Sequence, residues 1–300
     1  MLAMAEPAPL IIEAALNGGT PKSRNPNVPR TPAEIAAEAI RCVDAGAAIV
    51  HNHNDEPVIG GPNGVHDPAP YIEAWRQILA ARPGVILYPT MASGGPHTTI
   101  EERYAHIPAL ADAGVLGQGL VDPGSVNVGP LDAEGLPMPA DRPYINTLRD
   151  ARYMFAFCRE RGVGPSISIF EPGFLRVALT YHRAGWVPPG AMVKLYFGGE
   201  ALPFGLPPTE ASLEAYLDML EGSGLHWSVA TLGGDAVANG LARLALECGG
   251  HVRVGLEDYS GPRTPTNLEL VKEVTALAAD VGRPIASPGE ARGVLGLASA

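Results

Sequence analysis

The sequence contains few cysteines, no long apolar run and no segment with the features of a leader peptide. Its three cysteines are odd in number and scattered through apolar helical segments, so we expect buried thiols rather than a disulfide framework: Cys42, Cys158 and Cys248. No apolar run approaches the length that crosses a bilayer. Residues 1–10 lack a basic region and include Glu6, which argues against a signal peptide. These absences predict a soluble protein of the reducing cytoplasm.

Basic clusters are also missing. The formal net charge is −11, and no run of five basic residues offsets it. We therefore expect no extended surface that binds nucleic acid or an anionic membrane. A local basic pocket can still bind an anionic small molecule. The hydrophobic fraction of 46% is that of an ordinary globular core, and 300 residues suit one large domain or two small ones.

An alternation of strand and helix patterns repeats eight times along the chain. Strands are expected at Leu10–Leu16, Ala47–His53, Gly84–Thr90, Leu116–Val121, Ser166–Phe170, Met192–Phe197, His226–Thr231 and His251–Leu256. After a first helix that begins at Pro32, helices are expected at Pro68–Ala81, Thr99–Ala113, Thr147–Arg161, Leu175–Ala184, Thr209–Glu221, Ala236–Glu247 and Thr266–Val281. In the first helix, Thr31 and Glu34 have the spacing of a capping box, and Gly46 follows its end.

Eight such units in this length predict a closed (β/α)₈ barrel, an α/β fold. We expect a single domain over residues 1–300, with a C-terminal extension after the last unit. The alternative is a doubly wound open sheet, but the regular units without a composition break favour closure. Asp122–Asn146 is a long, turn-rich loop after the fourth strand, and loops of that length are functional or take part in subunit contacts.

A candidate metal site lies at the end of the second strand. His51 and His53 are two residues apart, so in a strand both imidazoles project to one face. Glu257 follows the apolar run of the eighth strand and offers a carboxylate. Two histidines and one carboxylate leave a divalent metal with open positions, which is how catalytic zinc sites are built.

Barrel geometry brings these distant residues together. Active sites of such barrels sit at the C-terminal ends of the strands, and strand one lies between strands eight and two. Glu13 near the end of strand one therefore joins His51, His53, Glu257 and Asp258 at one rim. The other histidines have no partner spacing and are not expected to be ligands.

Several motifs carry a resemblance to a known family. They include Glu13-Ala14-Ala15-Leu16-Asn17-Gly18, Pro29-x-Thr31-Pro32-x-Glu34-Ile35, Ala45-Gly46-Ala47-Ala48-Ile49-Val50-His51-x-His53, Trp227-Ser228-Val229-Ala230, Gly249-Gly250-His251-Val252-Arg253-Val254-Gly255-Leu256-Glu257-Asp258 and Ala286-x-Pro288-x-Glu290-Ala291-Arg292. Over nearly its whole length the chain resembles the β-keto acid cleavage enzymes, a (β/α)₈ family. The segment that ends at Asp258 is very specific, whereas His-x-His alone is weak.

The resemblance implies a zinc-dependent reaction of a β-keto acid with acetyl-CoA, giving acetoacetate and a new CoA thioester. It also implies a homotetramer. By resemblance, the zinc ligands are His51, His53 and Glu257, the Arg–Asp pair is Arg253 and Asp258, and the N-terminal active-site glutamate is Glu13. The same comparison suggests substrate contacts at Ser93 and at Ser125 or Asn127.

The sequence departs from the family pattern at three places. Asn54-Asp55-Glu56-Pro57 follows His-x-His where the family has x-Arg-Asp-Pro, Pro165-Ser166-Ile167-Ser168 replaces an acidic Pro-Glu-x-Glu, and Tyr259 replaces Asn. These changes concern the substrate pocket more than the metal site. Asp55 and Glu56 are ordinary loop charges or complement a cationic or polar substrate tail, since like charges disfavour a second carboxylate.

The chemistry assigns roles to the remaining candidates. Asp258 is the natural base for the proton of a chelated β-keto acid, and Arg253 on the same strand orients it and holds it ionised, or else fills the barrel as half of a salt bridge. Glu13 either contacts substrate or orients a ligand histidine.

Two further groups are candidates for binding an anionic ligand. The pair Gly233-Gly234 is either a turn that binds a phosphate of CoA or an ordinary tight turn. Lys22 and Arg24 in the first loop are candidates for contact with an anionic substrate or with CoA, and a solvated loop is the default interpretation.

Two other functions stay open. A metal-dependent hydrolase barrel also uses His-x-His, but it adds histidines from strands five and six, and these strands contain none here. A non-catalytic ligand-binding barrel with a structural metal needs no inward-facing base, whereas Asp258 and Arg253 are both present. Formation of product that depends on acetyl-CoA separates these possibilities.

Overall fold

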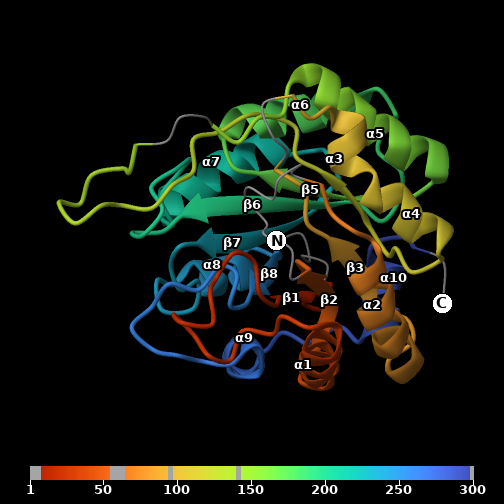
Figure 1. Ribbon diagram of the computed structural model, residues 1–300. Helices are drawn as coiled ribbons and strands as arrows, with labels where there is room; N and C mark the ends of the chain where they lie inside the picture. Colours follow the sequence, from red (N-terminus) through yellow and green to blue (C-terminus); the bar gives the residue numbers. More distant parts are fainter. Residues whose placement is uncertain (1–7, 55–64, 94–96, 140–142, 298–300) are drawn as a thin grey trace, which may run out of the picture.

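The computed structural model describes residues 8–54, 65–93, 97–139 and 143–297. Eight parallel strands run in the order β3-β2-β1-β8-β7-β6-β5-β4, with helices around the outside (Figure 1). The strands are β1 Ile12–Ala15, β2 Ala47–Asn52, β3 Ile86–Pro89, β4 Gly119–Val121, β5 Pro165–Ile169, β6 Met192–Gly198, β7 His226–Leu232 and β8 His251–Val254.

The two outer strands of this order, β3 and β4, come together at a narrow seam. The N–H groups of Gly117 and Gln118 donate to the carbonyl oxygen of Leu87, at 2.8 and 3.2 Å. This contact makes the sheet a nearly closed barrel, and the prediction of a (β/α)₈ fold is confirmed. The doubly wound alternative is wrong, because an open sheet would keep its two edge strands apart.

The helices are α1 Pro32–Asp44, α2 Ala69–Ala81, α3 Ile100–Tyr104, α4 His106–Asp112, α5 Leu148–Arg161, α6 Pro172–Arg183, α7 Glu210–Leu220, α8 Leu241–Glu247, α9 Asn267–Val281 and α10 Pro288–Val294. The capping box at the start of α1 is confirmed: Glu34 N–H donates to the Thr31 hydroxyl, and the Glu34 carboxylate accepts from Thr31 N–H. Each such cap satisfies backbone donors that the first turn leaves free.

Two expected helices differ from the structure. The helix expected at Thr99–Ala113 divides into α3 and α4, because Pro108 has no N–H to donate to the carbonyl of Tyr104. The helix expected at Ala236–Glu247 begins only at Leu241. Its first residues form a turn instead, since the Asp235 carboxylate accepts the N–H groups of Val237 and Ala238.

The C-terminal end of β8 also differs from expectation. The strand ends at Val254 rather than Leu256, and Gly255 lies in the positive-φ region at +155°. A Cβ at Gly255 would come within 1.9 Å of the carbonyl oxygen of Ala15 in β1. Glu257 and Asp258 therefore lie on a tight turn above the strand rather than on the strand itself.

The cysteines agree with the prediction in part. Cys42 and Cys158 are buried thiols, whereas Cys248 is exposed, so its expected burial is wrong. Cys248 is the C-cap of α8, where the helix surface faces solvent. Within the described residues, no helix combines the length and the apolar character that a membrane span requires.

Candidate active site

Two imidazoles and one carboxylate meet at the C-terminal end of the barrel. His51 is the fifth residue of β2, His53 follows that strand, and Glu257 lies on the turn after β8. The Nε2 atom of His51 lies 3.1 Å from Oε2 of Glu257, and Nε2 of His53 lies 3.2 Å from Oε1 of the same carboxylate. Glu257 is thus in contact with two histidines more than 200 positions away, because only one strand, β1, lies between β2 and β8.

Hydrogen bonds outside the metal-facing side fix the positions of the two histidines. Nδ1 of His51 lies 3.3 Å from the carbonyl oxygen of Tyr88, and a carbonyl only accepts, so this nitrogen carries the proton and Nε2 faces the site. The His51 ring also stacks on the Tyr88 ring, with 4.5 Å between centroids. His53 is fixed through its backbone, because Asn17 accepts its N–H and donates to its carbonyl oxygen.

The position of Glu257 depends on a glycine in the loop after β1. A Cβ at Gly18 would come within 2.3 Å of Cγ of Glu257, and Gly18 itself has φ +49°. The Asn17 side chain accepts the N–H of Gly18 and so fixes this backbone. The loop after β1 and the turn after β8 therefore pack closely enough to orient the carboxylate.

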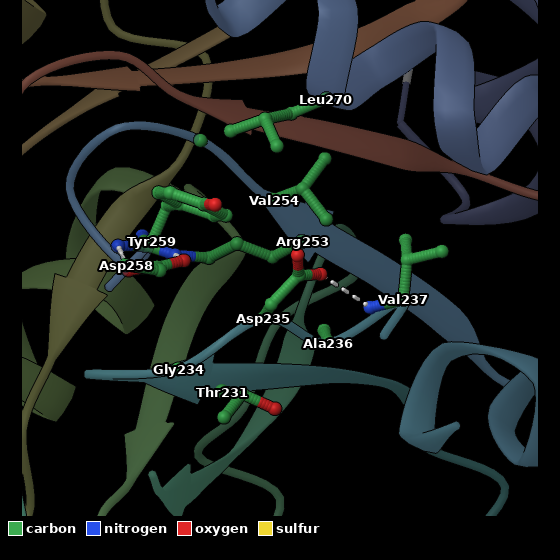
Figure 2. A pocket seen from close by; sticks show the side chains of 11 residues that line it. Thr231, Gly234, Asp235, Ala236, Val237, Arg253, Val254, Asp258, Tyr259 and Leu270 are labelled. Carbon is green, nitrogen blue, oxygen red and sulfur yellow. Dashed lines mark hydrogen bonds and ion pairs between the residues drawn. The ribbon is translucent and has the colours of Figure 1, made fainter. Parts of the chain in front are cut away.

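Arg253 and Asp258 form a bidentate pair beside this group. Nε and Nη2 of Arg253 donate to the two carboxylate oxygens of Asp258, each at 2.8 Å, and Nη2 also lies 2.9 Å from Oε1 of Glu257. Figure 2 shows the Arg253 side chain extending from β8 to Asp258, with Tyr259 alongside. The fork of the guanidinium suits such parallel contacts and fixes the orientation of the aspartate. The pocket drawn there has room for about one water.

Below this pair, charged and aromatic side chains fill the barrel interior. Glu13 accepts a hydrogen bond from Arg253 at 3.1 Å and another from the Tyr88 hydroxyl, and it forms an ion pair with Lys194 of β6. Lys194 is fully buried, and its Nζ atom lies 3.7 Å from the centroid of the Tyr88 ring. Glu13 thus faces cations and a tyrosine rather than a ligand histidine.

Burial and charge act on the ionisation of these groups in opposite directions. Burial alone would raise the pKa of Glu13 and Glu257, but the neighbouring cations hold the pKa of each below its usual value. Burial lowers the pKa of His51 to about 4 and that of Lys194 to about 8. The histidine is therefore neutral at pH 7 and its Nε2 lone pair is available to a metal.

The pKa of Asp258 differs from the expectation that Arg253 would be the main influence on it. Burial raises the pKa of Asp258 to about 6, and Arg253 only limits that rise. At neutral pH the group is mostly ionised yet close to its titration range. A carboxylate in this condition is suited to accept a proton and to release it again.

The backbone N–H groups of Gly233 and Gly234 are both in use. They donate to the carbonyl oxygen of Asp258, at 2.8 and 3.3 Å. This contradicts the expectation that they are free to bind a phosphate of CoA. Their role in the structure is to hold the turn that carries Glu257 and Asp258.

Of the predicted substrate-contact residues, the structure describes Ser93, Ser125 and Asn127. Ser93 is half-buried after β3. Ser125 and Asn127 are exposed on the long loop, where the Ser125 hydroxyl exchanges hydrogen bonds with the backbone of Asn146 at 3.0 Å. Asp55 and Glu56 lie outside the described residues.

Three interior residues were missed by the sequence analysis. Lys194 is one of only three lysines in the chain and the only charged residue of an otherwise apolar strand. This pattern in the sequence could have identified it as a functional or structural residue of the barrel interior. Tyr88 had no such signal. Asp122, just after β4, is buried, which raises its pKa, and Tyr144 donates to it at 2.5 Å. Ser166 and Ser168, which depart from the acidic residues of the family pattern, are buried nearby on β5.

The triad has the properties that a divalent metal requires. One ligand atom from each of His51, His53 and Glu257 lies within 4.8 Å of the others. Among the described residues, Glu257 Oε2 accepts no hydrogen bond although it is buried. Nitrogen and carboxylate donors in this arrangement fit zinc or a similar ion. Fold and site together define a class: a (β/α)₈ barrel with a metal-site geometry at the rim where such enzymes carry out their chemistry.

Comparison with known proteins agrees with this class and narrows it. The family model for beta-keto acid cleavage enzyme matches residues 9–297. The 3-keto-5-aminohexanoate cleavage enzyme of Fusobacterium nucleatum is 32% identical over 295 residues, covering 96% of this chain and 98% of the relative. The 3-oxoadipate:acetyl-CoA acetyltransferase of Cupriavidus necator is 28% identical over 300 residues, covering 97% and 96%. This chain belongs to the β-keto acid cleavage enzyme family.

A solved structure supports the fold alone. The ternary complex of ObcA with C4-CoA adduct and oxalate matches with a TM-score of 0.68 and 20% sequence identity. The match covers 92% of this chain and 68% of that one.

Proposed function

We propose that this protein is a zinc-dependent β-keto acid cleavage enzyme, which condenses a β-keto acid with acetyl-CoA to give acetoacetate and a new acyl-CoA. The observation that carries the proposal is the convergence of His51, His53 and Glu257 beside the Arg253–Asp258 pair. The names of the F. nucleatum and C. necator relatives, a cleavage enzyme and an acetyl-CoA acetyltransferase, support the same reaction class.

His51, His53 and Glu257 would hold the metal, which when bound supplies Lewis-acid polarisation of the keto oxygen. Counted at neutral pH, three carboxylates (Glu13, Glu257, Asp258) and two cations (Lys194, Arg253) give this centre one net negative charge. A divalent ion reverses the sign. The metal-loaded site then suits the carboxylate of a β-keto acid.

Asp258 is the proposed base. In our proposal it accepts a proton from the carbon between the two carbonyl groups, and Arg253 keeps its carboxylate aimed through two hydrogen bonds. The resulting carbanion attacks the thioester carbonyl of acetyl-CoA. Transfer of CoA to the original keto carbon and cleavage of the carbon–carbon bond give the two products, steps that follow from the family resemblance.

The substrate tail is the open part of the proposal. Asp122 is a buried carboxylate, and no described residue donates to its Oδ1. We propose that it accepts a hydrogen bond from a polar or cationic tail, beside Ser166 and Ser168 of β5, which stand where the family pattern has acidic residues. Ser93, Ser125, Asn127, Asp55 and Glu56 stay predictions for substrate contact.

The test is product analysis of the zinc-loaded protein with acetyl-CoA and β-keto acids that carry neutral, cationic or anionic tails. We expect acetoacetate and one new thioester by mass spectrometry, with cationic or polar tails preferred. Faster turnover of dicarboxylic substrates would exclude the Asp122 role. Absence of product from every tail class, with zinc bound, would favour the hydrolase or the non-catalytic barrel.

We further propose a cytoplasmic homotetramer in which the loop after β4 contributes to the interface. This loop extends away from the barrel body (Figure 1) and exposes Leu136 and Met138. Light scattering measures the mass in solution. A tetrameric mass that falls in L136E/M138E supports the arrangement, and a monomeric wild type contradicts it.

A further inference from the structure

A pocket of about 150 Å³ borders the turn that carries Glu257 and Asp258. Its walls come from the loop after β1 and the loop after β8, and they include Thr20, Arg24, Tyr259, Arg263 and Thr264. Leu256, which also lines it, is the residue directly before Glu257. The pocket and the candidate metal site therefore share one turn of the backbone.

Arg24 is the cation of this pocket that lacks an acidic partner. Its Nη2 donates to the hydroxyl of Ser260, and among the described residues no carboxylate oxygen lies within 4 Å of its guanidinium. The neighbouring cations are neutralised: Lys22 pairs with Glu34 at 2.6 Å, and Arg263 pairs with Glu273 at 2.6 Å. In a chain with a net charge of −11, an unneutralised guanidinium in a pocket favours an anionic ligand.

Tyr259 adds a second donor. Its hydroxyl oxygen accepts the N–H of Arg263 at 3.2 Å, and the described residues take no hydrogen bond from its proton. The side chain is mostly buried and fixed, because Gly261 packs so closely that a Cβ there would meet the hydroxyl at 2.1 Å. A guanidinium and a hydroxyl that line one small pocket match the oxygens of a phosphate group.

We infer that this pocket binds a phosphate group of the coenzyme A portion of acetyl-CoA. The inference rests on the proposed function, in which the thioester of the same molecule reacts beside Glu257 and Asp258. A ligand with a reactive acyl group at one end and phosphates further along its chain can extend from the metal site to a pocket that the same turn borders. The N–H groups of Gly233 and Gly234, the other phosphate candidates, already donate to the carbonyl oxygen of Asp258.

Calorimetric titration of the zinc-loaded protein with CoA tests the inference. We expect R24Q to weaken CoA binding by about 5- to 20-fold and Y259F by about 3-fold, since each removes one phosphate contact. K22Q is the matched control: it removes a charge from the same loop, but that charge is paired with Glu34, so affinity stays within about 2-fold. Pantetheine, which lacks phosphate, should bind the wild type and R24Q equally.

Other outcomes separate the inference from the proposed function. Unchanged CoA affinity in R24Q, with acetoacetate formation intact, overturns the phosphate site alone. A wild type that binds no CoA overturns both. Inorganic phosphate serves as a further probe in the same titration. If it binds the pocket as strongly as CoA does and does not compete with CoA, the site is one for free phosphate and the inference is wrong.

Discussion

Lys194 shows how a single residue can determine the interior of this barrel. Its ammonium group has no solvent exposure, and its ion pair with Glu13 spans from β6 to β1. Burial lowers the pKa of Lys194 to about 8, while the facing carboxylate favours the charged form. Each partner is tolerated in the core only because the other is present.

Replacement of this lysine should therefore destabilise the protein strongly. We expect K194M to reduce the free energy of unfolding by about 3–5 kcal/mol, because Glu13 then keeps a buried charge with one cation fewer. Urea unfolding measures the change. K22M, which breaks an exposed pair with Glu34, should alter stability by less than about 1 kcal/mol. Equal losses in both variants would contradict the role assigned to Lys194.

Glu257 and Asp258 are adjacent in sequence, yet we expect their substitutions to have different consequences. D258N keeps the shape of the side chain but removes the proton acceptor, so kcat should fall by about 10³-fold or more while zinc content is unchanged. E257Q should lose zinc, because it removes the anionic ligand. Steady-state kinetics and elemental analysis of the same samples separate the two effects. Loss of zinc in D258N would contradict this division.

At the scale of elements, the loop after β1 and the turn after β8 act as one unit. They approach each other at Gly18, and hydrogen bonds from Thr20 to the carbonyl oxygen of Leu256 and from Glu257 N–H to Ala15 connect them. The orientation of the Glu257 carboxylate is therefore set by packing from a different element.

This arrangement gives a prediction with a neighbouring control. G18A should displace Glu257 and lower zinc affinity by about 10- to 100-fold, the usual effect of disturbing the support of a metal ligand. In G19A nothing lies within 4 Å of the added Cβ, so its affinity should match the wild type. Competition with a chromogenic chelator measures both. Circular dichroism confirms that the helices remain, and equal affinities in the two variants would exclude the contact as a determinant.

The molecule as a whole should be sensitive to mild acid, because several histidines outside the candidate metal site are buried and neutral. Burial lowers the pKa of His66 and His251 to about 3 and that of His106 to about 4. Unfolded histidine titrates near 6.5, so between that value and the folded pKa the unfolded chain binds more protons. The stability that these histidines contribute is fully present above about pH 6.5 and is lost as the pH decreases.

His106 allows this dependence to be measured at one position. Its Nε2 donates to the carbonyl oxygen of Thr90 at 2.8 Å, and a glutamine amide can make the same bond. At pH 5 the histidine should reduce the free energy of unfolding by about 2 kcal/mol relative to pH 7, and H106Q should lose that part of the pH dependence. H97Q alters an exposed histidine and should follow the wild type. Parallel curves for H106Q and the wild type would contradict the assignment.

The sequence by itself determined the architecture and the three residues of the candidate metal site. Strand and helix periods are local, so eight β/α units were readable without tertiary contacts, and alternation along β2 put His51 and His53 on one side. Barrel closure then made β1 the only strand between β2 and β8, which predicted the meeting with Glu257. The break at Ala105 was missed because the helical period continues through Pro108 and outweighed the proline signal.

Only the tertiary structure decided how the site is supported. The pairing of Lys194 with Glu13, the occupied N–H groups of Gly233 and Gly234, and the tight approach at Gly18 all join residues far apart in sequence. Such contacts depend on strand register and on the path of the turn after Val254, which no local pattern encodes. The charge state of Asp258 likewise follows from burial, a property of the packed barrel rather than of its neighbours in the chain.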